Sequence, residues 1–142
     1  MIKFIIICFF LILNSCSSLK KDIVYCPKVI TPKKAAEVIV KSQNNSLVYI
    51  GFRGVSTYCI KDNDNIEMQI SVNVRAIRKD IKSEDFVPVN ISVVSTDLNN
   101  KEYDRDGFKY LHFLLKGSKI VDRETTFDIK IPKSGQVFLG IR

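Results

Sequence analysis

Apolar and polar residues alternate along much of the chain after residue 46. The clearest case is the segment from Ile66 to Arg78, in which apolar Ile66, Met68, Ile70, Val72, Val74 and Ala76 alternate with polar Glu67, Gln69, Ser71, Asn73 and Arg75. A period of two places one set of side chains on a core and the other set in water. This segment is therefore predicted to be a long, half-buried β-strand.

Other segments alternate in the same way or are rich in β-branched and aromatic residues, and polar turns separate them. We expect further strands over Leu47 to Phe52, Val55 to Lys61, Phe86 to Thr96, Phe108 to Lys116, Ile120 to Ile131 and Val137 to Ile141. The predicted connections are Arg53-Gly54, the turn from Asp62 to Asn65, a charged loop from Lys79 to Asp85, a polar excursion from Asp97 to Gly107, and turns at Gly117-Ser118 and Pro132 to Gln136.

The segment before Leu47 carries a weaker pattern. The stretch from Ile23 to Ile30 is rich in β-branched residues, but Pro27 lacks a backbone donor and confines the stretch to an edge strand or a strand end. Thr31-Pro32 resembles an N-cap followed by proline in the first turn of a helix. The spacing of the apolar residues that follow predicts one short helix or turn as far as about Lys41.

About seven strands with at most one short helix near the N-terminus predict a mainly β fold. We expect residues 23–142 to form a single antiparallel β-sandwich of immunoglobulin-like or fibronectin-like architecture, with a small barrel as the alternative. The chain has no Trp, so the Cys, Trp, Cys hallmark of antibody-type domains is absent. The likeness is one of architecture, which does not give function.

The start of the chain has a different pattern, in which Lys3 precedes the apolar run from Phe4 to Leu13 and small polar residues follow. This is the layout of a secretory signal. The run is too short for a membrane-spanning helix, which needs about 20 residues. Leu13-Asn14-Ser15-Cys16 resembles the bacterial lipobox, whose cysteine becomes the lipidated N-terminus. We expect a cleaved signal over residues 1–15; an ordinary signal with a cysteine nearby is the alternative.

Lipid on Cys16 would attach the protein to a membrane, and two or more acyl chains hold such a protein firmly. Residues 16–22 are short, polar and without pattern, and are expected to form a flexible tether. Ser17 stands where an Asp would retain many lipoproteins in the inner membrane. By that resemblance, the expected location is the bacterial cell envelope, facing the periplasm, with the outer membrane favoured.

The four cysteines divide between the two parts of the chain. Cys8 leaves with the signal and Cys16 takes the lipid, so Cys26 and Cys59 remain. In an oxidising periplasm such a pair is expected to form a disulfide bond, and closing a loop of about 30 residues contributes on the order of 3 kcal/mol. Two buried free thiols are the alternative. Two cysteines and the single distant His112 do not make a zinc site.

The charge balance is basic, with 22 Lys and Arg against 15 Asp and Glu, a formal charge of +7 that falls to +6 once Lys3 leaves with the signal. A basic surface is what phosphate binding requires. The lysines are scattered along the chain, however, instead of gathered into a stripe. We therefore predict a solvated surface with some attraction to anionic headgroups and no nucleic-acid partner.

No segment carries a catalytic or cofactor motif. Asp62, Asp64 and Glu67 do not fit a calcium-binding loop, because Glu67 stands where the EF-hand needs Gly and Asn73 where it needs a bidentate Glu. His112 has no nearby Ser or Cys arranged as nucleophile and base. We predict no catalytic residue, no metal site and no cofactor.

Asp97, Asp104 and Asp106 are predicted to form turns. With no catalytic motif, the chain is predicted to be a non-enzymatic binding or structural module whose loops or strand edges contact an envelope protein. An envelope enzyme or enzyme inhibitor is one alternative, favoured if folding unites His112 with carboxylates. A surface-exposed adhesin-like factor is another.

Several short motifs together resemble small alphaproteobacterial, rickettsia-like lipoproteins of uncharacterised function. They are the lipobox, Cys26-Pro27-Lys28-Val29-Ile30, Cys59 after a hydrophobic strand, the basic end of the long strand at Arg75 to Arg78, Phe86-Val87-Pro88-Val89 and the closing Phe138-Leu139-Gly140-Ile141. The resemblance covers nearly the whole chain after residue 15. It implies an envelope location, a β-rich fold and a paired Cys26 and Cys59, and it carries no activity.

Overall fold

The structure, a computed structural model, describes residues 21–142; the predicted signal, Cys16 and residues 17–20 of the tether lie outside the described residues. Within residues 21–142, one short helix and eight strands follow each other. They are β1 (Val29–Ile30), α2 (Lys33–Ala36), β2 (Glu37–Lys41), β3 (Leu47–Asp62), β4 (Asn65–Arg78), β5 (Asp85–Thr96), β6 (Glu102–Leu114), β7 (Ile120–Ile131) and β8 (Gln136–Ile141).

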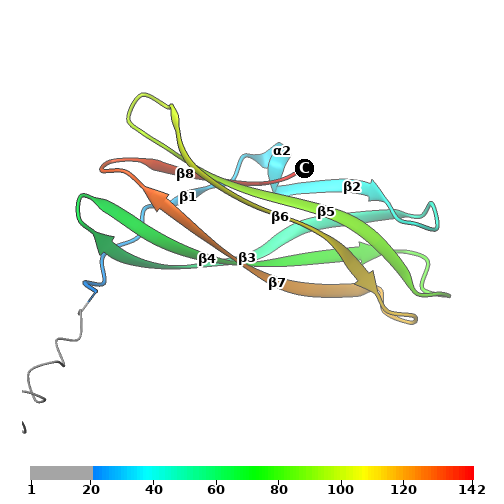
Figure 1. The fold of residues 1–142 in the computed structure, drawn as a ribbon. Coiled ribbons are helices and arrows are strands. Elements are labelled where there is room, and N and C mark those ends of the chain that lie inside the picture. Colours follow the sequence, from blue (N-terminus) through cyan, green and yellow to red (C-terminus); the bar gives the residue numbers. More distant parts are fainter. Residues whose placement is uncertain (1–20) are drawn as a thin grey trace, which may run out of the picture.

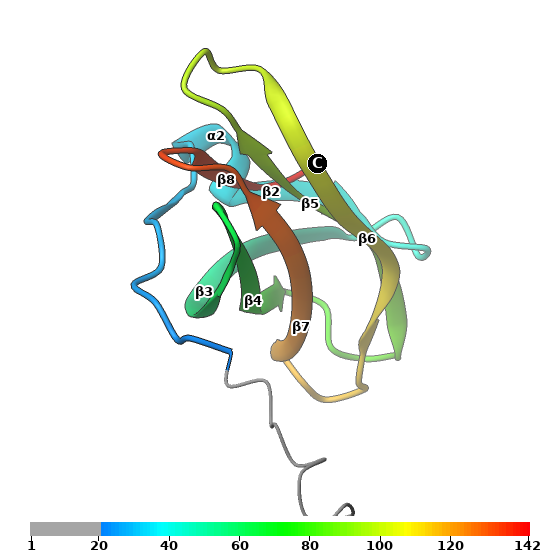
Figure 2. The same cartoon turned by 60° about the vertical axis from the view of Figure 1, so that its left-hand side comes forward.

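The strands form two four-stranded sheets that pack face to face (Figure 1, Figure 2). Sheet I has the strand order β2-β3-β4-β7, and sheet II has the order β1-β8-β5-β6. Neighbouring strands are antiparallel except β1 and β8, which are parallel. The predicted antiparallel β-sandwich is confirmed, and across residues 21–142 the sheets do not close into the alternative barrel.

The core lies between the sheets and comes from the alternating segments. In β4, the apolar side chains from Met68 to Ala76 are at most 1% exposed, and the alternate side chains of β5 from Val87 to Val93 are at most 2% exposed. The second half of β7 adds Phe127, Ile129 and Ile131. The period of two in the sequence therefore identified the buried face correctly, because one face of each sheet packs against the other sheet.

The two strands predicted on either side of Arg53-Gly54 are one continuous strand, β3. A β-bulge between Phe52 and Gly54 shifts the register with β4 and leaves Arg53 as the extra residue. Before the bulge the side chains of even-numbered Val48 and Ile50 are buried, whereas after it the side chain of odd-numbered Cys59 is buried. The bulge therefore changes the phase of the apolar pattern at the position where the sequence predicted a connection between two strands.

The predicted helix ends earlier than expected. Only α2 is helical, and β2 takes the residues from Glu37 to Lys41. Val38 and Val40 pair with Ile50 and Val48 of β3 and pack against the core. Pairing with a buried neighbouring strand thus overrides the helical spacing, as is common for β-branched residues.

The stretch from Ile23 to Ile30 is not one strand, because it crosses from sheet I to sheet II. Ile23 forms an isolated bridge with Ile60 of β3, and β1 pairs with β8 in the other sheet. Figure 1 and Figure 2 show this segment running along one side of the sandwich. Pro27 lies between the two pairings, where no backbone donor is needed.

The described chain begins at one end of the sandwich. Lys21 lies beside the β3–β4 turn, where its Nζ is 3.7 Å from the Glu67 carboxylate. Figure 1 shows the β7–β8 turn and the β5–β6 loop at the same end. Asn63, Asn100 and Ser134 adopt left-handed backbone conformations in these three connections, as tight turns between antiparallel strands require. No helix within residues 21–142 is long and apolar enough to cross a membrane.

Candidate functional site

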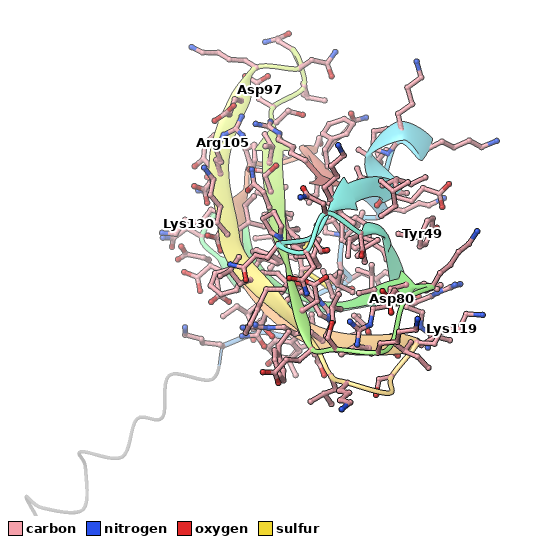
Figure 3. All side chains as sticks on the ribbon, turned by 90° about the vertical axis from the view of Figure 1, so that its right-hand side faces the viewer. Tyr49, Asp80, Asp97, Arg105, Lys119 and Lys130 are labelled. Carbon is pink, nitrogen blue, oxygen red and sulfur yellow. A yellow bond between two sulfur atoms is a disulfide. The ribbon has the colours of Figure 1, made fainter. Side chains whose placement is uncertain are left out.

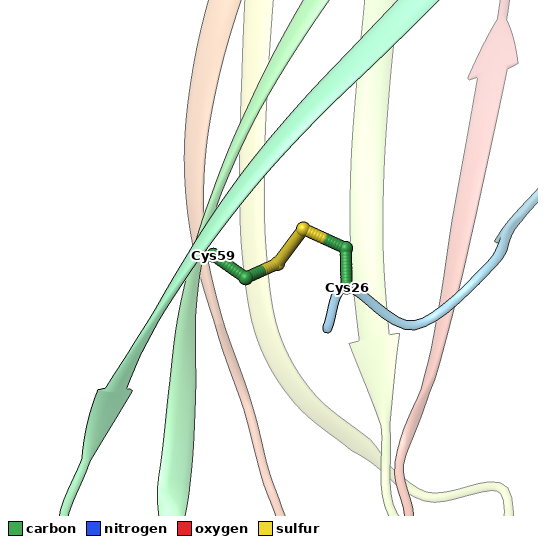
Figure 4. The surroundings of a disulfide bond; sticks show 2 residues. All are labelled: Cys26 and Cys59. Atoms are coloured by element: carbon green, nitrogen blue, oxygen red, sulfur yellow. A yellow bond between two sulfur atoms is a disulfide. The ribbon is translucent and has the colours of Figure 1, made fainter. Parts of the chain in front are cut away.

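Cys26 and Cys59 form a disulfide bond, with their Cα atoms 5.3 Å apart (Figure 4). The predicted pairing is confirmed, and the alternative of two free thiols is wrong. Cys59 is buried on the inner face of β3, and Cys26 packs against the same core from the crossing segment. The bond therefore fastens the first described segment to the middle of the sandwich.

His112 lies between the sheets with only 1% of its surface exposed. Its Nδ1 is 3.3 Å from the Tyr110 hydroxyl, and the Arg123 guanidinium lies 4.2 Å from the centroid of the Tyr110 ring. Burial lowers the pKa of His112 and raises the pKa of Tyr110 to about 12. Both side chains are therefore neutral at neutral pH and serve as part of the packing of β6.

The negative charge of Asp122, on β7, tends to raise the pKa of His112. Both carboxylate oxygens of Asp122, however, accept hydrogen bonds from Arg75, at 2.8 Å each. Arg75 and Asp122 are directly paired across β4 and β7. The carboxylate is thus engaged on the outer face of sheet I. Within the described residues, the structure does not gather His112 and carboxylates into one concave cluster.

The acidic residues of the β3–β4 turn are also separately engaged. Asp62 lies 4.0 Å from Lys130, and Glu67 pairs with Lys21. Residues 21–142 contain no group of three His, Cys, Asp or Glu side chains that could hold a metal ion. The turn residue Asn63, with a φ of 54°, lets β3 pair directly with β4.

The predicted turn formers have two different roles. Asp97 forms the predicted turn, because its Oδ1 accepts hydrogen bonds from the backbone N–H groups of Asn99 and Lys101. Asp104 and Asp106 lie within β6 instead, so the prediction of turns there is wrong. The second half of the predicted polar excursion is a strand, and its polarity comes from a contact that this strand makes with β7.

The contact closes part of the outer edge of β7. The backbone N–H of Lys130 donates to Asp104 Oδ2 at 2.7 Å, and the N–H of Asp128 donates to Asp106 Oδ2 at 3.1 Å. Ser95 of β5 donates its hydroxyl to the Lys130 carbonyl. Figure 3 shows Lys130 and Arg105 on this side of the sandwich, with Tyr49 on the opposite side. Side chains of sheet II therefore satisfy an exposed edge of sheet I.

The outer edge of β3 is different. β2 pairs with β3 only as far as Gly51, and the crossing segment meets β3 again at Cys59, whose carbonyl accepts the Val24 N–H at 3.1 Å. Between these points, within residues 21–142, no strand pairs with this edge. Residues 53–58 are all exposed. We call this stretch the open edge.

A hollow of about 330 Å³ adjoins the open edge. It is lined by Ile23, Val24, Tyr25, Cys26, Thr57, Tyr58 and Cys59. Tyr25 is 99% exposed, Ile23 71% and Tyr58 50%. A cluster of exposed large apolar side chains beside unpaired backbone is a typical site of protein recognition. The open edge and this hollow form the candidate site.

The sequence prediction did not find this site. Arg53 to Tyr58 lies in strand-like sequence, and only the loss of the regular apolar alternation there marked it as different. The available signal was the phase change at Arg53, together with Gly54, Ser56 and Thr57, which are small or polar. What exposes the edge is the end of β2 at Glu37, and that depends on pairing between distant segments.

No family model, no curated protein and no solved structure matches the chain. The resemblance to alphaproteobacterial lipoproteins therefore stays a prediction from the sequence.

Proposed function

We propose that this chain is a lipid-anchored lipoprotein of the bacterial cell envelope, a non-enzymatic binding or structural module that faces the periplasm. Cys16 would carry the lipid and the outer membrane is the favoured location. The observation that carries the proposal is the Cys26–Cys59 disulfide. Stable disulfides belong to oxidising compartments such as the periplasm, in agreement with the secretory pattern and lipobox that precede it.

The position of the described N-terminus also supports this arrangement. The described chain starts at Lys21, at the end of the sandwich where the β3–β4 turn lies. A membrane anchor at Cys16 would place this end toward the bilayer and leave the sides of the sandwich accessible. The open edge lies on one of those sides, and exposed strand edges bind other proteins by main-chain hydrogen bonds.

The anchor is tested by metabolic labelling with palmitate in a bacterial host. Cys16→Ser should abolish the label and release the protein from the membrane fraction. Cys8→Ser is the matched control, because it removes a cysteine from the predicted signal and should leave the label intact. Labelling that persists in the Cys16→Ser variant would overturn the assignment of the lipid.

The binding role is tested by crosslinking in cells that express the full chain with its own signal. The control is an unrelated domain carried on the same lipid anchor. One dominant envelope protein that crosslinks to the chain and not to the control supports the proposal. Equal crosslinking patterns for both proteins would contradict a specific protein partner and favour a small ligand or a glycan.

A further inference from the structure

We infer that the open edge of β3 binds one extended peptide segment of an envelope protein, which adds to sheet I as a strand beside residues 53–58. The segment would carry an apolar side chain facing Val55 and a net negative charge. This inference rests on the proposed role as a binding module and names its surface and partner class. It does not depend on the lipid.

The backbone of the open edge is oriented for strand addition. The Cys59 carbonyl and the Lys61 N–H both point away from β4, since they bond to Val24 and Asp22 of the crossing segment. From Gly54 to Asp62 the register with β4 is regular. Val55 and Thr57 therefore also direct their N–H and C=O groups outward, because alternate residues of a strand share a direction.

Both ends of the open edge are blocked by the chain itself. β2 occupies the neighbouring position up to Gly51, and residues 22–24 occupy it from Cys59 onward. In an antiparallel pairing of two such edges, β2 of one copy would meet the crossing segment of the other copy. An extended peptide can bend away at both ends, whereas a second copy or a broad sheet edge cannot. The geometry thus selects a single peptide strand.

The side chains around the open edge favour an apolar residue on the peptide. Val55 is 42% exposed and has the same parity along β3 as the buried Cys59. A peptide side chain on that face would cover Val55 beside the disulfide. On the other face, Ile23 and Tyr58 flank the hollow of about 330 Å³. Burying such side chains would add apolar contacts to the main-chain hydrogen bonds of the added strand.

The charges around the open edge are complementary to an acidic peptide. Arg53, Lys28 and Lys61 are exposed and take part in none of the ion pairs formed among residues 21–142. Asp22 is the acidic residue of the crossing segment. Glu37, which pairs with Gly51 beside Arg53, offsets one of these charges, and Asp22 offsets another. The small net positive charge that remains around the edge would attract an acidic strand and raise its association rate.

The test uses the full chain, extracted from membranes in detergent, and a phage-displayed library of short linear peptides. Selection should enrich peptides that combine an apolar residue with a net negative charge. Binding of a selected peptide should slow amide exchange at Val55 and Thr57, whose N–H groups point outward. The N–H groups of Ser56 and Tyr58 point toward β4, so these amides should already exchange slowly without peptide.

Val55→Pro removes one outward N–H without touching the pairing with β4, and should weaken peptide binding by at least about tenfold. Val55→Thr keeps the N–H and the branched shape, and should retain most of the affinity. Thr57→Pro repeats the test at the other outward position if Val55→Pro does not fold. An unchanged disulfide and unchanged amide exchange in β4 show that each variant is folded.

Three results would overturn the inference: no enrichment above the background of the library, bound peptides that leave Val55 and Thr57 unprotected, or a concentration-dependent dimer that Val55→Pro abolishes. The last result would assign the edge to a second copy. None of these results bears on palmitate labelling at Cys16, so a failure of this inference is distinguishable from a failure of the proposed anchor.

Discussion

The two outer edges of sheet I are managed in opposite ways. At β7, the carboxylates of Asp104 and Asp106 accept hydrogen bonds from two backbone N–H groups, so side chains from the other sheet close part of the edge. At β3, two segments of the chain's own backbone close the ends and leave residues 53–58 open. One edge is partly satisfied within the fold, whereas residues 53–58 of the other have no strand paired beside them within residues 21–142.

The difference shows how a sandwich can protect one sheet edge from pairing and leave a short window at another. An unprotected edge strand is a template for uncontrolled pairing. The carboxylates opposite β7 accept hydrogen bonds from two of its backbone donors. At β3, a short window with blocked ends leaves room only for a short strand. Four changes test these differences. They remove the disulfide at one blocked end of the open edge, remove the carboxylates that face β7, protonate the histidine of β6, and remove a positive charge beside the open edge.

The largest effect is expected from removing the disulfide with Cys26→Ser and Cys59→Ser together. The bond spans 33 residues, and its loss should lower the free energy of unfolding in urea by roughly 3 to 4 kcal/mol. The crossing segment should also detach from β3, so that the Lys61 amide exchanges faster. The wild-type protein in reductant should behave in the same way. If Lys61 stayed protected in the double variant, the blocked end would not depend on the disulfide.

A smaller effect is expected from Asp104→Ala with Asp106→Ala. This change leaves two backbone donors of β7 without acceptors and should lower the free energy of unfolding by about 2 kcal/mol. Amide exchange at Asp128 and Lys130 should accelerate, and the protein should aggregate more readily. Glu102→Ala is the control, because Glu102 is on the same strand but pairs with Arg105. Equal effects from both variants would argue against edge closure.

The stability of the fold should also decrease in mild acid, because β6, the strand that closes part of the β7 edge, carries the buried His112. Burial lowers the pKa of His112 in the folded state, so the unfolded chain takes up this proton first as the pH falls below about 6.5. Stability should therefore be full above that pH and decrease below it, by at most about 1.4 kcal/mol per pH unit from this group. His112→Gln should flatten the decrease in urea titrations between pH 7 and pH 5. Tyr103→Phe should leave the decrease unchanged, since Tyr103 lies on the same strand but its hydroxyl contacts Asn65 instead of His112.

The smallest effect is expected from Arg53→Gln at the open edge. Arg53 is the exposed residue of the bulge, so the free energy of unfolding should stay within about 0.5 kcal/mol of the wild type. Affinity for an acidic peptide should fall a few-fold, and less so at high salt. Lys116→Gln removes the same charge from a distant turn and should change neither quantity. A matching loss of affinity there would indicate a general charge effect.

The sequence allowed the parts of the fold that depend on local pattern to be predicted. Alternation identified β4 and β5 because each side chain reports its own face, and the disulfide followed because only Cys26 and Cys59 were left to pair. The helix was extended too far, since nothing local shows that Val38 and Val40 meet β3. Asp104 and Asp106 were assigned to turns because the backbone N–H groups that donate to their carboxylates lie on β7, far away in the sequence. The open edge depends on where β2 begins to pair with β3, which is also a long-range property.

If Cys16 carries the proposed lipid, the disulfide also determines how force enters the domain. When the membrane and the domain move apart, tension enters at Lys21 and runs along residues 22–24, which lie antiparallel to β3. Their hydrogen bonds are loaded in shear, and the Cys26–Cys59 bond passes the remaining force directly into β3. The short strand β1, helix α2 and strand β2 lie within the loop that this bond closes, so the load bypasses them. The disulfide therefore protects the short elements between Cys26 and Cys59 from force applied at the N-terminal end of the domain.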